Sequence, residues 1–197
     1  PFTPPARENS PYRSFSAFAG NPLYIDIKDL VTRGWVVEED LRNVPDLSDT
    51  KVDFVAVKQF KEKIFKKAFE NFKKENNKVE FKKFLKENEC WVNDYSLFMA
   101  LNDYFQGKTW NQWPEAIAWR KTEALKEYKN KLEDEIEYHK FLQFVFYRQW
   151  QKLKKYANRR GIQIIGDVPI FVAHDSSDVW TNPELFKLDE EGNPAKV

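Results

Sequence analysis

A short apolar stretch between a glycine and an aspartate constrains the fold of this chain most. Residues 162–165 read IQII, they follow Gly161 at the end of a charged, helix-like run, and Asp167 comes directly after Gly166. A helix, a glycine stop, a short buried strand and a carboxylate at the strand's exit make one step of a parallel α/β sheet. The sequence therefore predicts a parallel strand that begins at Ile162.

Asp167 is the first candidate for a functional residue, because active sites of parallel barrels lie at the C-terminal ends of the strands. A second interpretation is equally open at this point. The carboxylate could cap the next turn or pair with a distant arginine, as many surface aspartates do.

The composition argues against several classes of binding partner and of protein. The net charge is +1 although 32% of the residues are charged, which argues against nucleic acid or an anionic membrane as the main partner. No apolar run approaches the roughly 20 residues of a membrane span. The single Cys90 cannot form an internal disulfide and favours a reducing, cytoplasmic environment. Seven tryptophans predict flat apolar faces, used either in the core or as stacking platforms for sugar rings.

Tyr12 is the second candidate. Pro11 fixes its own φ and pushes Ser10 toward an extended shape, so Tyr12 is held on a stiff backbone. Taken alone, the pattern favours a ring that packs on its own loop, against Phe15 and Phe18. The alternative is a platform on which a sugar stacks.

Most of the remaining chain has helical periodicity. The sequence predicts a strand-like run over 23–27, a short helix over 28–33, an amphipathic helix over 52–74 and two further helices over about 81–85 and 91–101. It also predicts a tight aromatic turn over 110–114. Residues 123–160 could form a nearly continuous helix with a break a little before His139.

No metal or cofactor site is predicted. His139 has no second histidine or cysteine at metal-binding spacing, so we expect a hydrogen-bonded histidine. The sequence contains no glycine-rich phosphate loop and no nucleophile elbow. Asp175 and Asp178 could be paired catalytic carboxylates. The favoured interpretation is that Asp175 or Ser176 caps a helix that has Asp178 in its first turn.

Four segments carry a family resemblance. Residues 10–26 (SPYRSFSAFAGNPLYID), 94–101 (DYSLFMAL), 144–150 (FVFYRQW) and 161–194 (GIQIIGDVPIFVAHDSSDVWTNPELFKLDEEGNP) resemble the amylomaltases, the 4-α-glucanotransferases of glycoside hydrolase family 77. The first and last of these segments are long and specific, and they occur in the family's order. The chain starts at Pro1 and stops within a polar run, so we expect an N-terminal or central fragment of a longer protein.

The resemblance implies an α/β fold, a partial (β/α)8 TIM barrel whose large helical insertion makes this chain mostly α. Residues 1–50 would be the loop region above the second barrel strand, with the SPY motif facing substrate. Residues 51–138 would form the helical insertion subdomain. Residues 139–197 would supply a barrel helix, the third strand over 162–168 and the following loop.

The resemblance also implies a function. The family transfers α-1,4-glucan (maltooligosaccharide) segments to acceptor sugars by retaining double displacement and without a cofactor. By position, Asp167 matches the family's supporting cleft residue at the end of the third strand. Tyr12 matches a tyrosine that stacks on the sugar, and Ser10 lies beside it. The nucleophile and the acid/base would follow Val197, so no catalytic carboxylate is expected in this chain.

Two departures refine this expectation. Ordinary amylases commonly carry Asn and His where this chain has Phe171 and Val172, which favours a transferase. The family's secondary glucan site uses aromatic residues at positions that here hold Arg7 and Lys58, which puts that site in doubt. The alternative function is a non-catalytic helical module that binds glucan or a protein partner.

Overall fold

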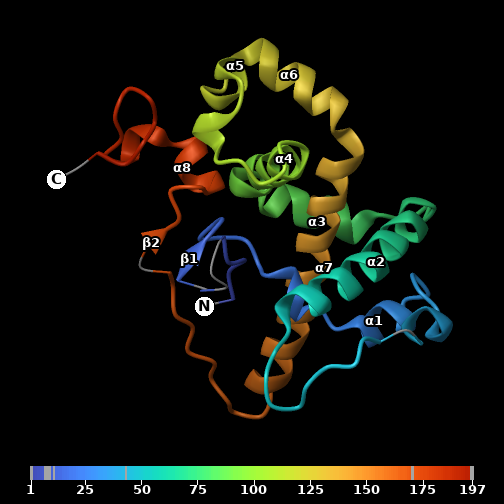
Figure 1. The fold of residues 1–197 in the computed structure, drawn as a ribbon. Coiled ribbons are helices and arrows are strands. Elements are labelled where there is room, and N and C mark those ends of the chain that lie inside the picture. The colour runs from blue at the N-terminus through green and yellow to red at the C-terminus, as the bar shows by residue number, and fades with distance from the viewer. Residues whose placement is uncertain (1, 7–9, 11, 43, 170, 196–197) are drawn as a thin grey trace.

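The computed structural model describes residues 2–6, 10, 12–42, 44–169 and 171–195, and it is mostly helical. Figure 1 shows α7 running down the middle of the molecule, with α1 and α2 on one side and β1 and β2 on the other. The helices are α1 Ile27–Thr32, α2 Phe54–Lys73, α3 Val79–Glu87, α4 Glu89–Tyr104, α5 Glu115–Ala118, α6 Thr122–Lys131, α7 Glu133–Asn158 and α8 Ser177–Thr181. The strands are β1 Arg13–Ser14 and β2 Phe171–Val172, and the short 3-10 helices are η1 Pro22–Tyr24, η2 Glu38–Leu41, η3 Trp110–Gln112 and η4 Pro183–Leu185.

The helix predictions are confirmed over most of the chain. The amphipathic run 52–74 becomes α2, where Asp53 caps the first turn by accepting from the N–H groups of Val55 and Ala56. The two helices that follow become α3 and α4, and the aromatic turn contains η3. The break in the long helical run is real and lies at Leu132, between α6 and α7.

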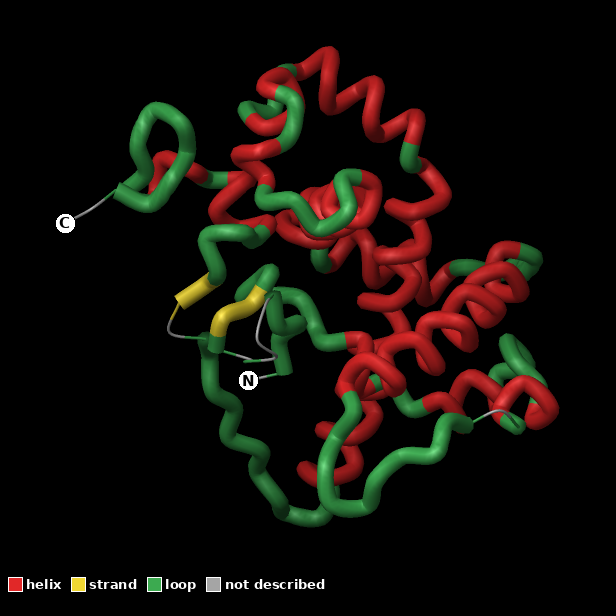
Figure 2. The backbone as a smooth tube through the Cα atoms, in the orientation of Figure 1, coloured by secondary structure: helices red, strands yellow, loops and turns green. Residues whose placement is uncertain are grey.

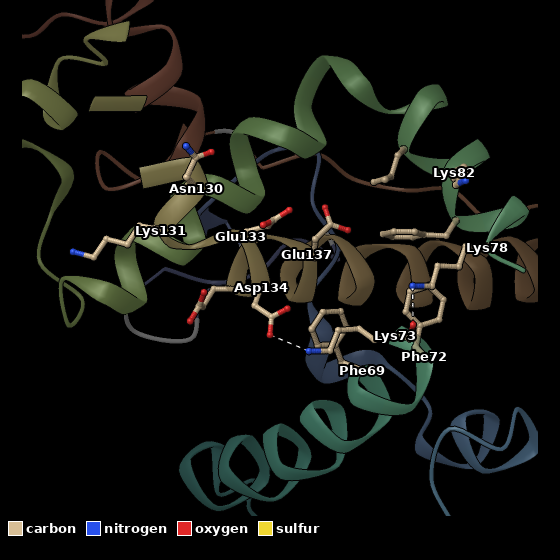
Figure 3. Close-up of a pocket in the computed structure, with 13 residues that line it drawn as sticks. Phe69, Phe72, Lys73, Lys78, Lys82, Asn130, Lys131, Glu133, Asp134 and Glu137 are labelled. Atoms are coloured by element: carbon tan, nitrogen blue, oxygen red, sulfur yellow. Dashed lines mark hydrogen bonds and ion pairs between the residues drawn. The ribbon is translucent and has the colours of Figure 1, made fainter. Parts of the chain in front are cut away.

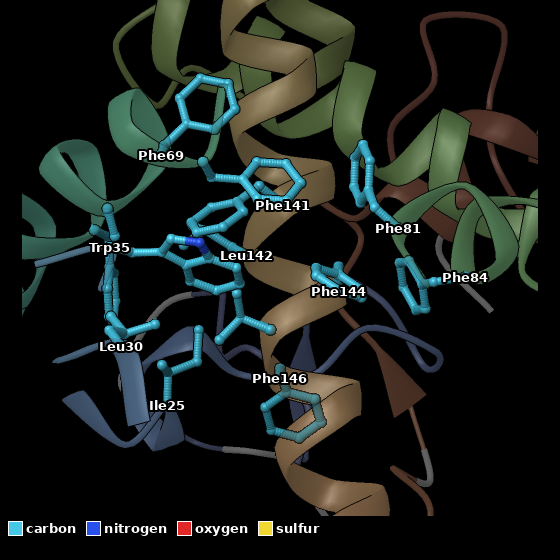
Figure 4. Close-up of a cluster of buried hydrophobic side chains, with 14 of the residues drawn as sticks. Ile25, Leu30, Trp35, Phe69, Phe81, Phe84, Phe141, Leu142, Phe144 and Phe146 are labelled. Carbon is cyan, nitrogen blue, oxygen red and sulfur yellow. The ribbon is translucent and has the colours of Figure 1, made fainter. Parts of the chain in front are cut away.

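One aromatic cluster joins α7 to α1, α2 and α3. Phe141 is fully buried, and its ring centroid lies 4.8 Å from that of Phe72, 5.6 Å from that of Phe69 and 5.4 Å from that of Trp35. Figure 4 shows Trp35 and Phe69 on one side of α7 and Phe81 and Phe84 on the other, with Phe141 and Phe144 on the helix between them. Large rings bury much apolar area, so this cluster provides most of the packing of the α1–α3 side.

A second cluster joins α4 to α5, α7 and α8. Its centre is Trp180 of α8, which is fully buried. Its ring centroid lies 5.9 Å from that of Phe98 and 5.7 Å from that of Trp113. Met99 packs between the two clusters, as expected of a core methionine. The second cluster therefore fixes α8, and with it the C-terminal loop, to the helical body.

The two strands form a parallel pair. Arg13 lies opposite Phe171, and Ser14 lies opposite Val172. Ser14 is fully buried and Val172 is half-buried, whereas Phe171 is 73% exposed. The pair therefore presents one face to the helical body and the other to solvent.

The strand predicted over 162–168 is not formed in this structure. Residues 162–169 have no regular secondary structure, and Figure 2 shows them as a loop that leaves the end of α7 and runs back to β2. Ile162 is 56% exposed, Ile165 94% and Val168 74%, so the expected burial is also absent. A strand needs a ladder partner, and among the described residues the sheet contains β1 and β2 alone, with one further bridge from Ser14 to Pro5. Gly161 does end the helix, with a φ of +73°.

The strand-like run predicted over 23–27 is also wrong. Asn21 accepts a hydrogen bond from the Leu23 N–H, and Pro22 follows it at the first position of η1. Asp26 then caps α1 by accepting from the Lys28 N–H. Two side-chain caps and a proline thus favour short helices over an extended run, although the apolar residues alternate as in a strand.

Candidate functional site

Tyr12 lies in a tight turn that leads into β1. The N–H of Arg13 donates to the carbonyl of Ser10 across this turn, at 3.2 Å. Beyond the turn, the N–H of Ala6 donates to the carbonyl of Arg13 at 2.9 Å, and that of Phe15 donates to Pro4 at 3.0 Å. Backbone hydrogen bonds on both sides of the turn therefore hold Tyr12, and its side chain is 45% exposed. Pro11, which is expected to stiffen this turn, lies outside the described residues.

Tyr12 contacts Asp167 directly. Its hydroxyl donates to Oδ2 of Asp167 at 3.1 Å, across 155 positions of sequence. Both side chains are exposed to solvent. The two candidate residues from the sequence are therefore in direct contact, and the partner of Asp167 in this bond is a tyrosine, not the arginine that the alternative interpretation named.

The carboxylate changes the chemistry of the phenol. The hydrogen bond to Asp167, and after it the negative charge of that carboxylate, raises the pKa of Tyr12 above its ordinary value. Tyr12 therefore stays neutral at any physiological pH. An exposed neutral ring beside a carboxylate can offer an apolar face and strong hydrogen-bond acceptors to the same ligand.

Ser10 supports the turn through its backbone, because its carbonyl accepts from Arg13. The residue is half-buried. Its predicted contact with substrate stays a prediction.

The C-terminal loop shows which interpretation of Asp175 and Asp178 holds. Ser176 caps α8, accepting from the Val179 N–H at 3.2 Å, and Asp178 lies in the first turn. Asp178 also accepts from the backbone N–H of Ala17 at 2.7 Å. The favoured capping interpretation is therefore confirmed. The contact between Asp178 and Ala17 could not be read from the sequence.

Gln143 is a second residue that sequence reasoning missed. It is 1% exposed on α7, its Oε1 accepts from the Gly20 N–H at 2.8 Å, and its Nε2 donates to the Gly20 carbonyl at 2.9 Å. A Cβ on Gly20 would lie 2.0 Å from the ring of Phe146, so only glycine permits this approach. An amide on the aromatic face of α7 was the signal available in the sequence.

Two cavities lie away from Tyr12 and Asp167. The larger, of about 700 Å³, lies between α2, α3 and the junction of α6 with α7 (Figure 3). Of its charged groups, Lys73 forms ion pairs with both Glu70 and Asp134. The smaller, of about 630 Å³, is lined by side chains of the η1–α1 region and of α7, among them Tyr24 and Trp150.

The described residues contain no group of three or more histidine, cysteine or acidic side chains that could hold a metal ion. His139 is buried, and its Nε2 lies 3.0 Å from Oδ2 of Asp103, which confirms a hydrogen-bonded histidine. Lys58 is exposed on α2, and Arg7 lies outside the described residues. No helix within the described part of the chain has the length and apolar character needed to cross a membrane.

Comparison with known proteins gives a consistent result. The family model described as 4-alpha-glucanotransferase matches residues 1–195. The 4-alpha-glucanotransferase of Thermus thermophilus is 44% identical over 200 residues, which cover 100% of this chain and 39% of that protein. The protein of the same name from Synechocystis is 42% identical over 200 residues, covering 100% and 40%.

A solved structure agrees with these sequences. The amylomaltase from Streptococcus agalactiae in complex with acarbose matches with a TM-score of 0.92 at 43% identity. The match covers 98% of this chain and 39% of that one. This chain therefore spans about two-fifths of the length of the relatives that it matches.

Proposed function

Since this chain belongs to the 4-alpha-glucanotransferase family, we propose that it supplies part of the glucan-binding wall of such an enzyme. The observation that carries the proposal is the 3.1 Å hydrogen bond between Tyr12 and Asp167. In the proposed site, the ring of Tyr12 stacks on a glucose unit of an α-1,4-glucan. The other oxygen of the Asp167 carboxylate, Oδ1, accepts hydrogen bonds from sugar hydroxyls, with Ser10 beside the same unit.

The whole protein is proposed to transfer maltooligosaccharide segments between α-1,4-glucans. A retaining transfer needs one carboxylate as nucleophile and a second as acid/base, about 5 Å apart. Asp167 donates neither bond nor proton in this scheme. It orients the sugar, and the two reacting carboxylates come from the part of the protein beyond this chain.

The segment assignments of the chain follow the same proposal. Residues 1–50 form the loop region of the glucan site, 51–138 the helical insertion, and 139–197 the barrel portion. α7 continues across the proposed boundary at 138, so the insertion and the barrel portion share one rigid helix. In the whole protein, the backbone of residues 162–168 would pair with other strands of a (β/α)8 barrel, which would bury Ile162 and Val168 on one face of the sheet and Ile165 on the other.

Calorimetric titration of the 197-residue chain with maltoheptaose tests the binding site. Tyr12→Ala should weaken binding by about tenfold, because stacking and one hydrogen bond are lost. Tyr104→Ala is the matched control, since Tyr104 is 43% exposed and also holds a charged partner, Lys131. Equal affinity of the parent and of Tyr12→Ala would contradict the proposal.

An activity assay tests the division of labour. The 197 residues alone should release no glucose from maltotriose. The whole natural protein that contains them should release it. Turnover by the 197 residues would show that the reacting carboxylates lie within this chain. Glucan binding without turnover in the longest natural chain would favour a non-catalytic binding module.

A further inference from the structure

The loop that carries Tyr12 is held by α8, and α8 is itself firmly anchored. Trp180 is fully buried, and its Nε1 donates to the carbonyls of Ile117 at 3.2 Å and Ala118 at 3.1 Å. The guanidinium of Arg120 lies 4.3 Å from the centroid of the same ring. An aromatic anchor with a satisfied N–H and a cation over its face fixes α8 to the helical body.

Three hydrogen bonds connect this anchored segment to residues 14–17. The N–H of Ala173 donates to the carbonyl of Ser14 at 3.0 Å, and the N–H of Ser177 donates to that of Phe15 at 2.8 Å. The third bond runs in the opposite direction, from the N–H of Ala17 to Oδ2 of Asp178 at 2.7 Å. Together they extend the β1–β2 pair into a continuous seam between the two loops.

The third bond differs from the other two in chemistry. It uses a carboxylate as acceptor, and hydrogen bonds to charged groups are shorter and stronger than neutral ones. Oδ1 of Asp178 also accepts from the hydroxyl of Ser177 at 3.2 Å, which fixes the orientation of the carboxylate. The other two bonds join backbone groups, so Asp178 provides the one side-chain acceptor among these three bonds, and truncation of its side chain removes that bond.

We propose that Asp178 is a positioning residue of the glucan site, which acts by holding the Tyr12 loop in register with Asp167. This inference rests on the proposed function. Asp178 touches neither Tyr12 nor sugar in this scheme. It fixes the backbone at Ala17, and β1 transmits that position to Tyr12, five residues earlier in the chain.

Three variants of the 197-residue chain test the inference. Asp178→Ala removes the acceptor for Ala17, and Asp178→Asn keeps an amide oxygen in the same place. Asp53→Ala is the matched control, because Asp53 accepts from two backbone N–H groups at the start of α2 and loses them in the same way. Circular dichroism first confirms that each variant is folded.

The first readout needs no sugar. In chains with tyrosines labelled at Cζ, the ionisation of Tyr12 is followed by NMR and assigned with Tyr12→Phe. Asp178→Ala should shift the pKa of Tyr12 back toward its ordinary value, because the ring moves away from the Asp167 carboxylate. Asp178→Asn and Asp53→Ala should leave the titration as in the parent. An unchanged Tyr12 titration in Asp178→Ala would overturn the inference.

The second readout is affinity for maltoheptaose. Asp178→Ala should raise the dissociation constant by about tenfold, and Asp178→Asn by about twofold or less. A general loss of stability would instead affect Asp178→Ala and Asp53→Ala alike, which would also overturn the inference. If the parent itself binds no maltoheptaose, the proposed function fails, and the Tyr12 titration still decides whether Asp178 positions the loop.

Discussion

The long helix α7 and the loop that follows it are consecutive in sequence and differ in what supports them. α7 has 26 residues and buries nine of them, including Phe141 and Gln143. Residues 162–169 include Ile165, which is 94% exposed, and form no strand. A helix satisfies its backbone within its own segment, whereas a strand depends on partners elsewhere. The helix α7 therefore has its packing partners within the described part of this chain, whereas residues 162–169 do not.

The largest expected effect on stability comes from removing a buried ring from α7, compared with removing an exposed ring from β2. Phe141→Ala should lower the free energy of unfolding by about 3–5 kcal/mol, because it leaves a cavity among three aromatic rings. Phe171→Ala removes the same ring from β2, where the side chain is 73% exposed, and should cost less than about 0.5 kcal/mol. Urea unfolding followed by circular dichroism measures both. Similar losses of stability in the two variants would contradict the difference in packing between α7 and β2.

A smaller effect is expected where α7 holds the site loop. Gln143→Leu should cost about 2–3 kcal/mol, because it leaves the buried N–H and carbonyl of Gly20 without partners. Gln151→Leu is the control, since Gln151 lies on the same helix and is exposed. Urea unfolding of the two variants gives the difference. Equal stability would show that the loop finds other partners for Gly20.

The third prediction separates two causes of a raised tyrosine pKa. Burial raises the pKa of Tyr147 to about 12, whereas the hydrogen bond and charge of Asp167 raise that of Tyr12. Asp167→Asn should therefore lower the pKa of Tyr12 and leave that of Tyr147 unchanged, as measured by Cζ NMR titration.

The sign of the pH dependence follows from these shifts. Each folded-state pKa lies above the ordinary value of 10.0, so the folded chain binds the phenolic protons more tightly than the unfolded chain. Their contribution to stability is complete below pH 10.0 and is lost as the pH rises through the raised values. If the pKa of Tyr12 is the same in Asp167→Asn as in the parent, the Tyr12–Asp167 contact of the proposed site is contradicted.

The sequence predicts the helices of this chain better than its extended segments. The periodicity of 52–74 predicts α2 within two residues at its start, because helix formation depends on neighbours three and four positions away. The strand-like run predicted over 23–27 is wrong, because the caps at Asn21 and Asp26 outweigh its alternating pattern. The predicted strand over 162–168 failed because no partner strand lies among the described residues.

The site was predictable in part. Local chemistry makes Asp167 a candidate and, taken alone, favours a Tyr12 ring packed on its own loop, whereas the family resemblance singles out both residues. The structure adds that they touch. The supports at Asp178 and Gln143 were not predictable, because each pairs with a backbone group more than 120 positions away. Such pairings depend on the tertiary fold and leave no local pattern.

A double-mutant cycle on maltoheptaose affinity tests most directly whether Tyr12 and Asp167 act as one site. Tyr12→Phe, Asp167→Asn and the double variant are titrated by calorimetry in the same chain. We expect that both single variants weaken binding and that the double variant loses less affinity than the sum of the two losses, with a coupling of about 0.5–1.5 kcal/mol. Losses that add fully, or single variants that bind as the parent does, would contradict it.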